Sequence, residues 1–213
     1  MRQPHIATGL TIVCSVLLFV ALACAVLHEA GVVGAFDRAI LAGLQARTGP
    51  TLLRAMQFVS ALHAPRGIVV MTALVALVLA WRRDWIDMAT VLVIVFGGAT
   101  LNHLLKHALR RARPGEPATG PTDFAFPSGH VANATLLYGV VAALLLCRVG
   151  AWPVKTAVAL GAALSVASVA LSRLVLGAHH PSDVLAAVLV GVAWLALCLT
   201  LRERLLAGRD GAG

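Results

Sequence analysis

The strongest candidate for chemistry in this sequence is a histidine followed four residues later by an aspartate. His179 and Asp183 flank Pro181, and proline is common in the first turn of a helix. A carboxylate within one turn of an imidazole can hold the Nδ1–H group and leave Nε2 free as a nucleophile or a base. Arg173 precedes them at the end of an apolar run, where an unpaired charge would be unfavourable. Taken alone, the His179 and Asp183 pair could simply cap a helix.

A second candidate is the segment Ser128, Gly129 and His130, which follows Pro127 and precedes another apolar run. Proline fixes the backbone φ angle, and glycine lets the backbone approach a ligand without a Cβ atom in the way. A helix that begins here presents free N–H groups and the positive end of its dipole, which suits a phosphate. Short triplets of this kind also occur by chance in turns.

A third group is basic. If the preceding helix continues through Lys106, then Lys106, Arg110 and Arg113 share one face over two turns, and Pro114 ends the helix. Such a row of cations beside a membrane either anchors lipid headgroups or binds an anion. Arg110 and its neighbour Arg111 could contact a headgroup or face water.

The elements that must position these groups are membrane spans. Of the 213 residues, 60% are hydrophobic and 12% are charged, whereas about 25% of the residues of a soluble domain are charged. This composition excludes an ordinary soluble globule and a disordered chain. The net charge of +8 comes from Lys and Arg in short breaks between apolar runs, which is typical of membrane-flanking charge and argues against a nucleic-acid partner.

The sequence therefore predicts an all-α, polytopic membrane helix bundle that forms one domain over residues 1–213. A helix needs about 20 residues to cross about 30 Å of hydrocarbon. The second and fifth apolar runs are shorter, so we expect these helices to extend past Arg66 and Lys155, whose long side chains can reach the interface. The six runs that predict transmembrane helices are residues 7–27, 67–81, 88–105, 131–147, 156–171 and 184–201.

Residues 28–66 form a long connection after the first span. Apolar side chains recur at helical spacing on both sides of a break at Gly49 and Pro50. We expect two amphipathic helices here, which either lie in the membrane interface or plug the bundle.

Topology brings the three chemical groups together. Lys106 ends the third run and His130 begins the fourth, while Arg173 ends the fifth and Asp183 begins the sixth. With alternating crossings, all of them lie at the same membrane face. Convergence of this kind favours an anion site over scattered anchoring charge.

At this point the sequence resembles the type-2 phosphatidic acid phosphatase family, which has three gapped motifs in this order. The motifs lie within residues 106–183, and the pattern of spans extends the resemblance over most of the chain. The residues that carry it are Lys106, six residues, Arg113 and Pro114; then Pro127, Ser128, Gly129 and His130; then Ser172, Arg173, five residues, His179, three residues and Asp183.

The resemblance implies hydrolysis of a membrane lipid phosphate through a phosphohistidine. His179 would attack phosphorus, Asp183 would orient it, and His130 would act as acid and then as base. The resemblance also implies that five groups bind the phosphoryl oxygens: Lys106, Arg113, Arg173, the Ser128 hydroxyl and the Gly129 N–H. His180 adjoins the nucleophile but lacks the required spacing.

We expect no metal and no cofactor. Besides Asp183, the only carboxylates between Lys106 and the last motif are Glu116 and Asp123, which is few for a two-metal centre. His103 and His107 are four residues apart and could bind a metal, but no third ligand is apparent.

The charge distribution bears on orientation. Eight of the 17 basic residues fall on the face of the termini and nine on the other face. Three of those nine, Lys106, Arg113 and Arg173, are explained by the phosphate site. Without these three, the face of the termini carries eight basic residues and the other face six. This excess favours cytoplasmic termini, with the active site facing the periplasm or exterior of a bacterial cytoplasmic membrane.

By analogy with bacterial members of the family, the candidate substrates are undecaprenyl diphosphate, phosphatidylglycerophosphate, phosphatidic acid and lipid A phosphates. The motif residues would bind the phosphoryl group that these lipids share, so they do not distinguish one substrate from another. The sequence does not indicate an oligomeric state. A lipid phosphotransferase that uses the same site is one alternative. A small transporter is another, since small residues suit helix contacts in a membrane; those considered are Gly97, Gly98, Gly161 and Gly191.

Overall fold

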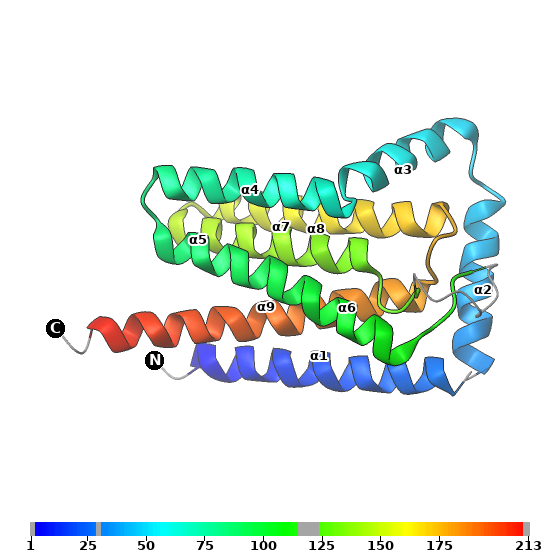
Figure 1. Ribbon diagram of the computed structural model, residues 1–213, viewed down its shortest axis with the longest axis horizontal. Coiled ribbons are helices and arrows are strands. Elements are labelled where there is room, and N and C mark those ends of the chain that lie inside the picture. Colours follow the sequence, from blue (N-terminus) through cyan, green and yellow to red (C-terminus); the bar gives the residue numbers. More distant parts are fainter. Residues whose placement is uncertain (1–2, 29–30, 115–123, 211–213) are drawn as a thin grey trace.

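The structure is a computed structural model that describes residues 3–28, 31–114 and 124–210. Every regular element in these ranges is a helix, which confirms the all-α class (Figure 1). The elements are α1 (Gln3–Leu27), α2 (Gly31–Gln45), α3 (Pro50–Leu62), α4 (Pro65–Trp81), α5 (Trp85–Leu92), the π-helical η1 (Val93–Gly97), α6 (Gly98–Leu109), α7 (Gly129–Arg148), α8 (Trp152–Val175) and α9 (Pro181–Asp210).

Five helical segments are long and apolar enough to cross a membrane: Ile6–Leu27, Trp85–Leu109, Gly129–Arg148, Trp152–Val175 and Pro181–Ala207. A sixth candidate span is the pair of α3 and α4, which are bent by 57° at a short break. About six spans are therefore confirmed. The second and fifth helices start at Pro65 and Trp152, so both extend past Arg66 and Lys155 as expected.

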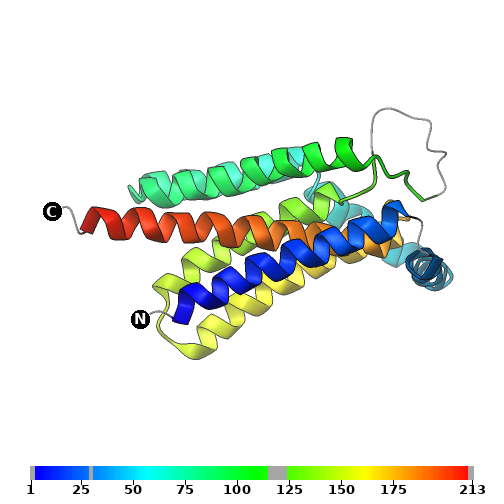
Figure 2. The same cartoon turned by 90° about the horizontal axis from the view of Figure 1, so that it is seen from below.

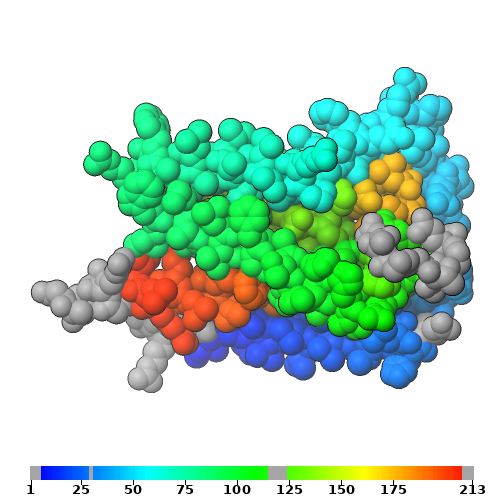
Figure 3. All heavy atoms as spheres, viewed as in Figure 1, coloured from blue at the N-terminus to red at the C-terminus, as the bar shows by residue number. Residues whose placement is uncertain are grey.

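The spans run side by side along the long axis, and α2 lies across one end of the bundle. It is seen nearly end-on in Figure 2. In the space-filling view, the end of α8 lies between the side chains of α3 and α2 (Figure 3). The start of α1 and the end of α9 lie at the opposite end (Figure 1).

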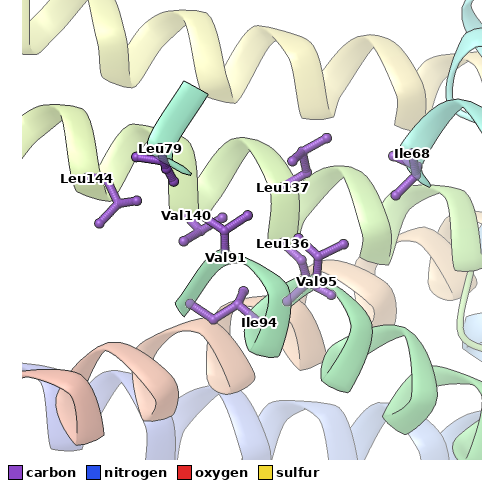
Figure 4. Close-up of a cluster of buried hydrophobic side chains, with 9 residues drawn as sticks. All are labelled: Ile68, Leu79, Val91, Ile94, Val95, Leu136, Leu137, Val140 and Leu144. Carbon is purple, nitrogen blue, oxygen red and sulfur yellow. The ribbon is translucent and has the colours of Figure 1, made fainter. Parts of the chain in front are cut away.

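The core is centred on α7, whose first half is buried on several sides. A cluster of nine buried apolar side chains joins it to the second and third spans (Figure 4); its members are Ile68, Leu79, Val91, Ile94, Val95, Leu136, Leu137, Val140 and Leu144. By contrast, large apolar side chains such as Leu17, Leu77 and Leu164 are exposed on the outside. This distribution is typical of a bundle whose outer surface contacts lipid.

The third span is one long helix interrupted by the π-turn of η1. Trp194 of α9 donates a hydrogen bond from Nε1 to the Ile94 carbonyl at 3.1 Å, which satisfies a backbone group near the irregular turn. Close approach depends on glycine here, because a Cβ atom on Gly98 would lie 2.4 Å from a Leu136 methyl group. Helix contacts are confirmed at Gly97, Gly98 and Gly191, but the expectation was wrong for Gly161, which has open space around it.

Candidate active site

The ends of four helices meet at the end of the bundle where α2 lies. α6 and α8 end there, and α7 and α9 begin there (Figure 1). Backbone hydrogen bonds join the three groups: the Ala125 N–H donates to the Arg111 carbonyl at 2.8 Å, and the Ser128 N–H donates to the Asp183 carbonyl at 3.1 Å. The predicted convergence on one face is therefore observed.

The start of α7 forms one wall of the site. The helix begins at Gly129, and Ser128 precedes it in an extended conformation. The Ser128 hydroxyl is fully buried and has no hydrogen-bond partner among the described residues. Lys106 lies against the same helix start, because a Cβ atom on Gly129 would be 3.8 Å from its Cε. A hydroxyl, an ammonium group and helix N–H groups together suit a phosphoryl oxygen.

His179 lies in the short segment between α8 and α9 and is 1% exposed. Its Nδ1 is 3.6 Å from Oδ2 of Asp183, slightly too far for a hydrogen bond. Burial lowers the pKa of His179 from 6.5 to about 4; the Asp183 carboxylate opposes this shift, and the charges of Lys106 and Arg173 add to it. The imidazole is therefore neutral near pH 7, as a nucleophile requires.

A turn after α8 delivers His179 to the site. Gly177 has φ +62°, and a Cβ atom there would lie 3.0 Å from Nε2 of Gln45. The Gly177 N–H donates to the Leu174 carbonyl and the Ala178 N–H to the Arg173 carbonyl, each at 3.0 Å. This is a helix end of the kind that glycine allows and other residues adopt at a cost.

The three predicted cations are held by local acceptors. Arg113 donates from a guanidinium nitrogen to the Ala178 carbonyl at 3.1 Å. Arg173 donates to the Ser60 hydroxyl of α3, and Lys106 donates to the Phe124 carbonyl. His130 lies close enough to Arg173, His179 and Arg113 for their charges to act on it. All eight predicted site residues are thus brought to one place.

One expectation about the basic segment was wrong. α6 ends at Leu109, and Arg110 adopts a left-handed conformation with φ +48°. The chain therefore leaves the helix before Arg113, so Lys106, Arg110 and Arg113 do not share a helical face. The side chain of Arg111 is 18% exposed and is bound to two buried carboxylates, and the residue also lines a cavity between α1, α2 and the basic segment.

Those contacts include residues that the sequence did not single out. Asp37 of α2 and Ser182 of α9 are both buried beside Arg111. One signal was available, because Asp37 is the only acidic residue between positions 31 and 62. The apolar spacing is enough to predict the helix that carries Asp37, and this spacing gives no indication of a partner for the carboxylate.

His63, at the end of α3, has a packing role. Its Nδ1 lies 2.8 Å from the Val59 carbonyl and must therefore carry the proton. Its Nε2 then accepts a hydrogen bond from the Tyr138 hydroxyl of α7 at 2.7 Å. This contact attaches α3 to the central helix.

The described residues contain no group of three His, Cys, Asp or Glu side chains placed to hold a metal ion. The rings of His103 and His107 pack edge to face with centroids 4.3 Å apart. Glu116 and Asp123, the other carboxylates noted in this part of the sequence, lie outside the described residues.

A cavity of about 680 Å³ adjoins the site between α1, α2 and the basic segment. Val26, Leu27 and Val33 contribute apolar surface to it. Its basic side includes Arg38 and Arg113. A cavity with both kinds of lining suits a ligand that is part anion and part hydrocarbon.

Comparison with known proteins agrees with this arrangement. Residues 87–206, more than half of the chain, match the PAP2 superfamily. A decaprenylphosphoryl-5-phosphoribose phosphatase of Mycobacterium tuberculosis is 34% identical over 52% of this chain and 56% of its own. Phosphatidylglycerophosphatase B of Bacillus subtilis is 33% identical over 53% and 56%, and a lipid A 1-phosphatase of Rhizobium johnstonii is 34% identical over 54% and 46%. The chain thus spans about half the length of the curated relatives it matches.

The fold extends the similarity beyond the matched sequence. The crystal structure of a transmembrane PAP2-type phosphatidylglycerolphosphate phosphatase from Bacillus subtilis superposes with a TM-score of 0.80 and 28% identity. The superposition covers 91% of this chain and 96% of the other. This protein is accordingly an integral membrane protein with membrane-spanning helices. Its motifs, their convergence and these similarities establish that the chain belongs to the PAP2 superfamily.

Proposed function

We propose that this protein is a lipid phosphate phosphatase that works through a phosphohistidine, with residues 1–213 acting as one membrane domain. The observation that carries the proposal is a buried, neutral His179 with a carboxylate at Nδ1, placed among Lys106, Arg173 and the start of α7. The named relatives, all phosphatases, support the reaction class.

In the first step, Nε2 of His179 attacks phosphorus and the bond to the lipid oxygen breaks. His130 donates a proton to the departing oxygen. In the second step, His130 takes a proton from water, which attacks the phosphohistidine and breaks the phosphorus–nitrogen bond. Free phosphate leaves, and both histidines return to their starting states.

The remaining groups stabilise charge rather than take part in bond exchange. Lys106, Arg113 and Arg173, with the Ser128 hydroxyl and the Gly129 N–H, hold the equatorial oxygens of the phosphoryl group. Phosphoryl transfer depends mainly on positioning and charge stabilisation. Five such donors supply what a metal ion would otherwise supply, so we expect turnover to survive EDTA. Loss of turnover in EDTA that a divalent cation restores would contradict this.

The substrate class is a phosphomonoester or diphosphate of a membrane lipid. The mixed apolar and basic lining of the adjoining cavity supports an amphiphilic anion. Undecaprenyl diphosphate, phosphatidylglycerophosphate, phosphatidic acid and lipid A phosphates all meet this description. The lipid would enter from the outer leaflet of a bacterial cytoplasmic membrane, with the active site facing outward.

The direct test assays detergent-purified protein against these four lipids and measures free phosphate, with His179→Ala as the matched inactive variant. We expect phosphate release from at least one lipid and none with the variant. Radiolabel that appears in a second lipid instead of free phosphate would assign a phosphotransferase. Undiminished release by His179→Ala would refute the mechanism.

A further inference from the structure

Asp37 is a fully buried carboxylate outside the family motifs. It lies on α2, the helix that crosses the end of the bundle (Figure 1), and its side chain has 0% exposure. Its Oδ1 accepts the Ser182 N–H at 3.0 Å. Its Oδ2 accepts from Arg111 at 2.8 Å and from the Ser182 hydroxyl at 2.5 Å. A buried carboxylate is tolerated only when it is paired in this way.

Arg111 joins this carboxylate to the active site. One guanidinium nitrogen donates to Asp37, and the other donates to Oδ1 of Asp183 at 2.5 Å. The second nitrogen also donates to the Ser182 hydroxyl at 2.6 Å. The planar fork of arginine fixes both directions at once, which the single ammonium group of lysine does not.

This fixes the orientation of the Asp183 carboxylate. Its Oδ1 is held by Arg111, while its Oδ2 accepts the His180 N–H at 2.7 Å and lies 3.6 Å from Nδ1 of His179. Nδ1 of His180 lies 3.4 Å from the same Oδ2. With both oxygens held, the carboxylate keeps Oδ2 beside the rings of both histidines, His179 included. At 3.6 Å the carboxylate is slightly beyond hydrogen-bond range, but its negative charge still favours the tautomer with hydrogen on Nδ1 and a bare Nε2.

We propose that Asp37, Arg111 and Ser182 are positioning residues for the reaction: they hold Asp183 in the orientation that keeps the imidazole of His179 ready to attack phosphorus. This inference rests on the proposed function above. The three side chains act through Asp183, and their hydrogen bonds run from α2 through Arg111 to the start of α9.

The opposite end of the bundle offers a matched control. Arg148 also bridges two carboxylates, but from a single nitrogen and at a more exposed place: its Nη2 donates to Asp84 at 2.8 Å and to Asp87 at 2.5 Å. It lies at the end of α7 remote from Gly129. Removal of Arg148 therefore disrupts a second arginine–carboxylate cluster without disturbing His179.

The kinetic test compares Arg111→Ala, Arg111→Lys and Asp37→Asn with Arg148→Ala and Asp84→Asn. Loss of the groups that orient a metal-binding histidine typically lowers metal affinity or activity about 10- to 100-fold, and Asp183 with its partners stands in the same relation to His179. We expect a fall of that size in kcat with little change in KM for the Arg111 and Asp37 variants. The Arg148 and Asp84 variants should keep the wild-type kcat. Added guanidinium should restore part of the kcat of Arg111→Ala and leave Arg148→Ala unchanged.

A spectroscopic readout separates this inference from the proposed function. In protein labelled with ¹⁵N-histidine, with the His179 signals identified by His179→Gln, we expect hydrogen on Nδ1 in the wild type. Arg111→Ala should shift the population toward the Nε2–H tautomer. Wild-type protein that releases no phosphate from any lipid rejects the proposed function but leaves this readout intact. An unchanged His179 spectrum in Arg111→Ala, or equal kcat losses in Arg111→Ala and Arg148→Ala, would overturn the positioning role.

Discussion

At the scale of single residues, burial determines the protonation state of the proposed nucleophile. His179 is enclosed at the junction of α8 and α9, and its pKa falls to about 4 although a carboxylate lies beside it. Desolvation of the imidazolium outweighs the attraction of Asp183, and the nearby cations act in the same direction. The residue is thus prepared to attack a phosphate without first losing a proton.

This shift predicts a pH-dependent contribution to stability. A histidine in the unfolded chain binds a proton below about pH 6.5, whereas folded His179 binds one only near pH 4. His179 therefore leaves stability unchanged above pH 6.5 and reduces it progressively as the pH falls toward 4. Melting temperatures in detergent at pH 7.5 and pH 5 should differ less for His179→Gln than for the wild type. The same difference in both proteins would contradict the assigned shift.

The motif residues could be predicted for two reasons. Their spacing resembles that of the PAP2 family, and topology brings Lys106, His130, Arg173 and Asp183, at the ends of apolar runs, to one face. The network of Asp37, Arg111 and Asp183 could not be predicted from the sequence. Asp37 and Arg111 are 74 positions apart, and their contact depends on where α6 ends. That end is set by the left-handed conformation of Arg110, which is a tertiary outcome that helical periodicity does not encode.

At the scale of elements, α2 and α3 support the site as well as covering it. The sequence predicted two amphipathic helices but left open whether they lie in the interface or plug the bundle. α2 contributes Asp37, and α3 contributes Ser60 to Arg173 and His63 to Tyr138. Asp37 and Ser60 therefore face the proposed site, while α3 also continues into the bent second span.

Two glycines near α8 allow a matched test of the turn that delivers His179. Gly177→Ala places an ordinary residue at φ +62°, which costs about 1–2 kcal/mol for an L-residue. Gly161→Ala adds a methyl group in the exposed interior of α8, with nothing within 4 Å, and should gain up to about 1 kcal/mol. We expect a lower melting temperature and reduced turnover for the first variant, and neither loss for the second.

Turnover is the decisive readout in this pair. If Gly177→Ala kept full turnover and the wild-type melting temperature, the left-handed turn would have no part in placing His179. Wild-type turnover in Gly161→Ala is needed to show that a methyl group near α8 is harmless in itself.

At the scale of the whole molecule, the bundle has two chemically different ends. The proposed phosphate site lies at one end, and the start of α1 and the end of α9 lie at the other (Figure 1). The cluster of Asp84, Asp87, Arg148 and Arg202 belongs to the end away from the site. Orientation in the membrane therefore decides which compartment supplies the water and receives the phosphate.

The charge balance of the sequence predicts that the ends of the chain lie in the cytoplasm. A reporter that functions only in the cytoplasm, such as a fluorescent protein, should be active when it is fused after Gly213. A reporter that functions only after export, such as alkaline phosphatase, should be inactive in the same position. The reverse pattern would place the active site on the cytoplasmic side.

The central claim is that His179 carries the phosphoryl group during turnover. The most direct measurement lets the protein react with a ³²P-labelled lipid phosphate and then quenches the reaction under alkaline conditions. The label is mapped by peptide mass spectrometry. We expect acid-labile, alkali-stable phosphate on His179. In His130→Ala, any phosphohistidine formed without the general acid should persist longer than in the wild type, because loss of the general base slows its hydrolysis by about 10²–10⁴-fold. Phosphate release with no label on His179 in either protein, or label on another residue, would contradict the account.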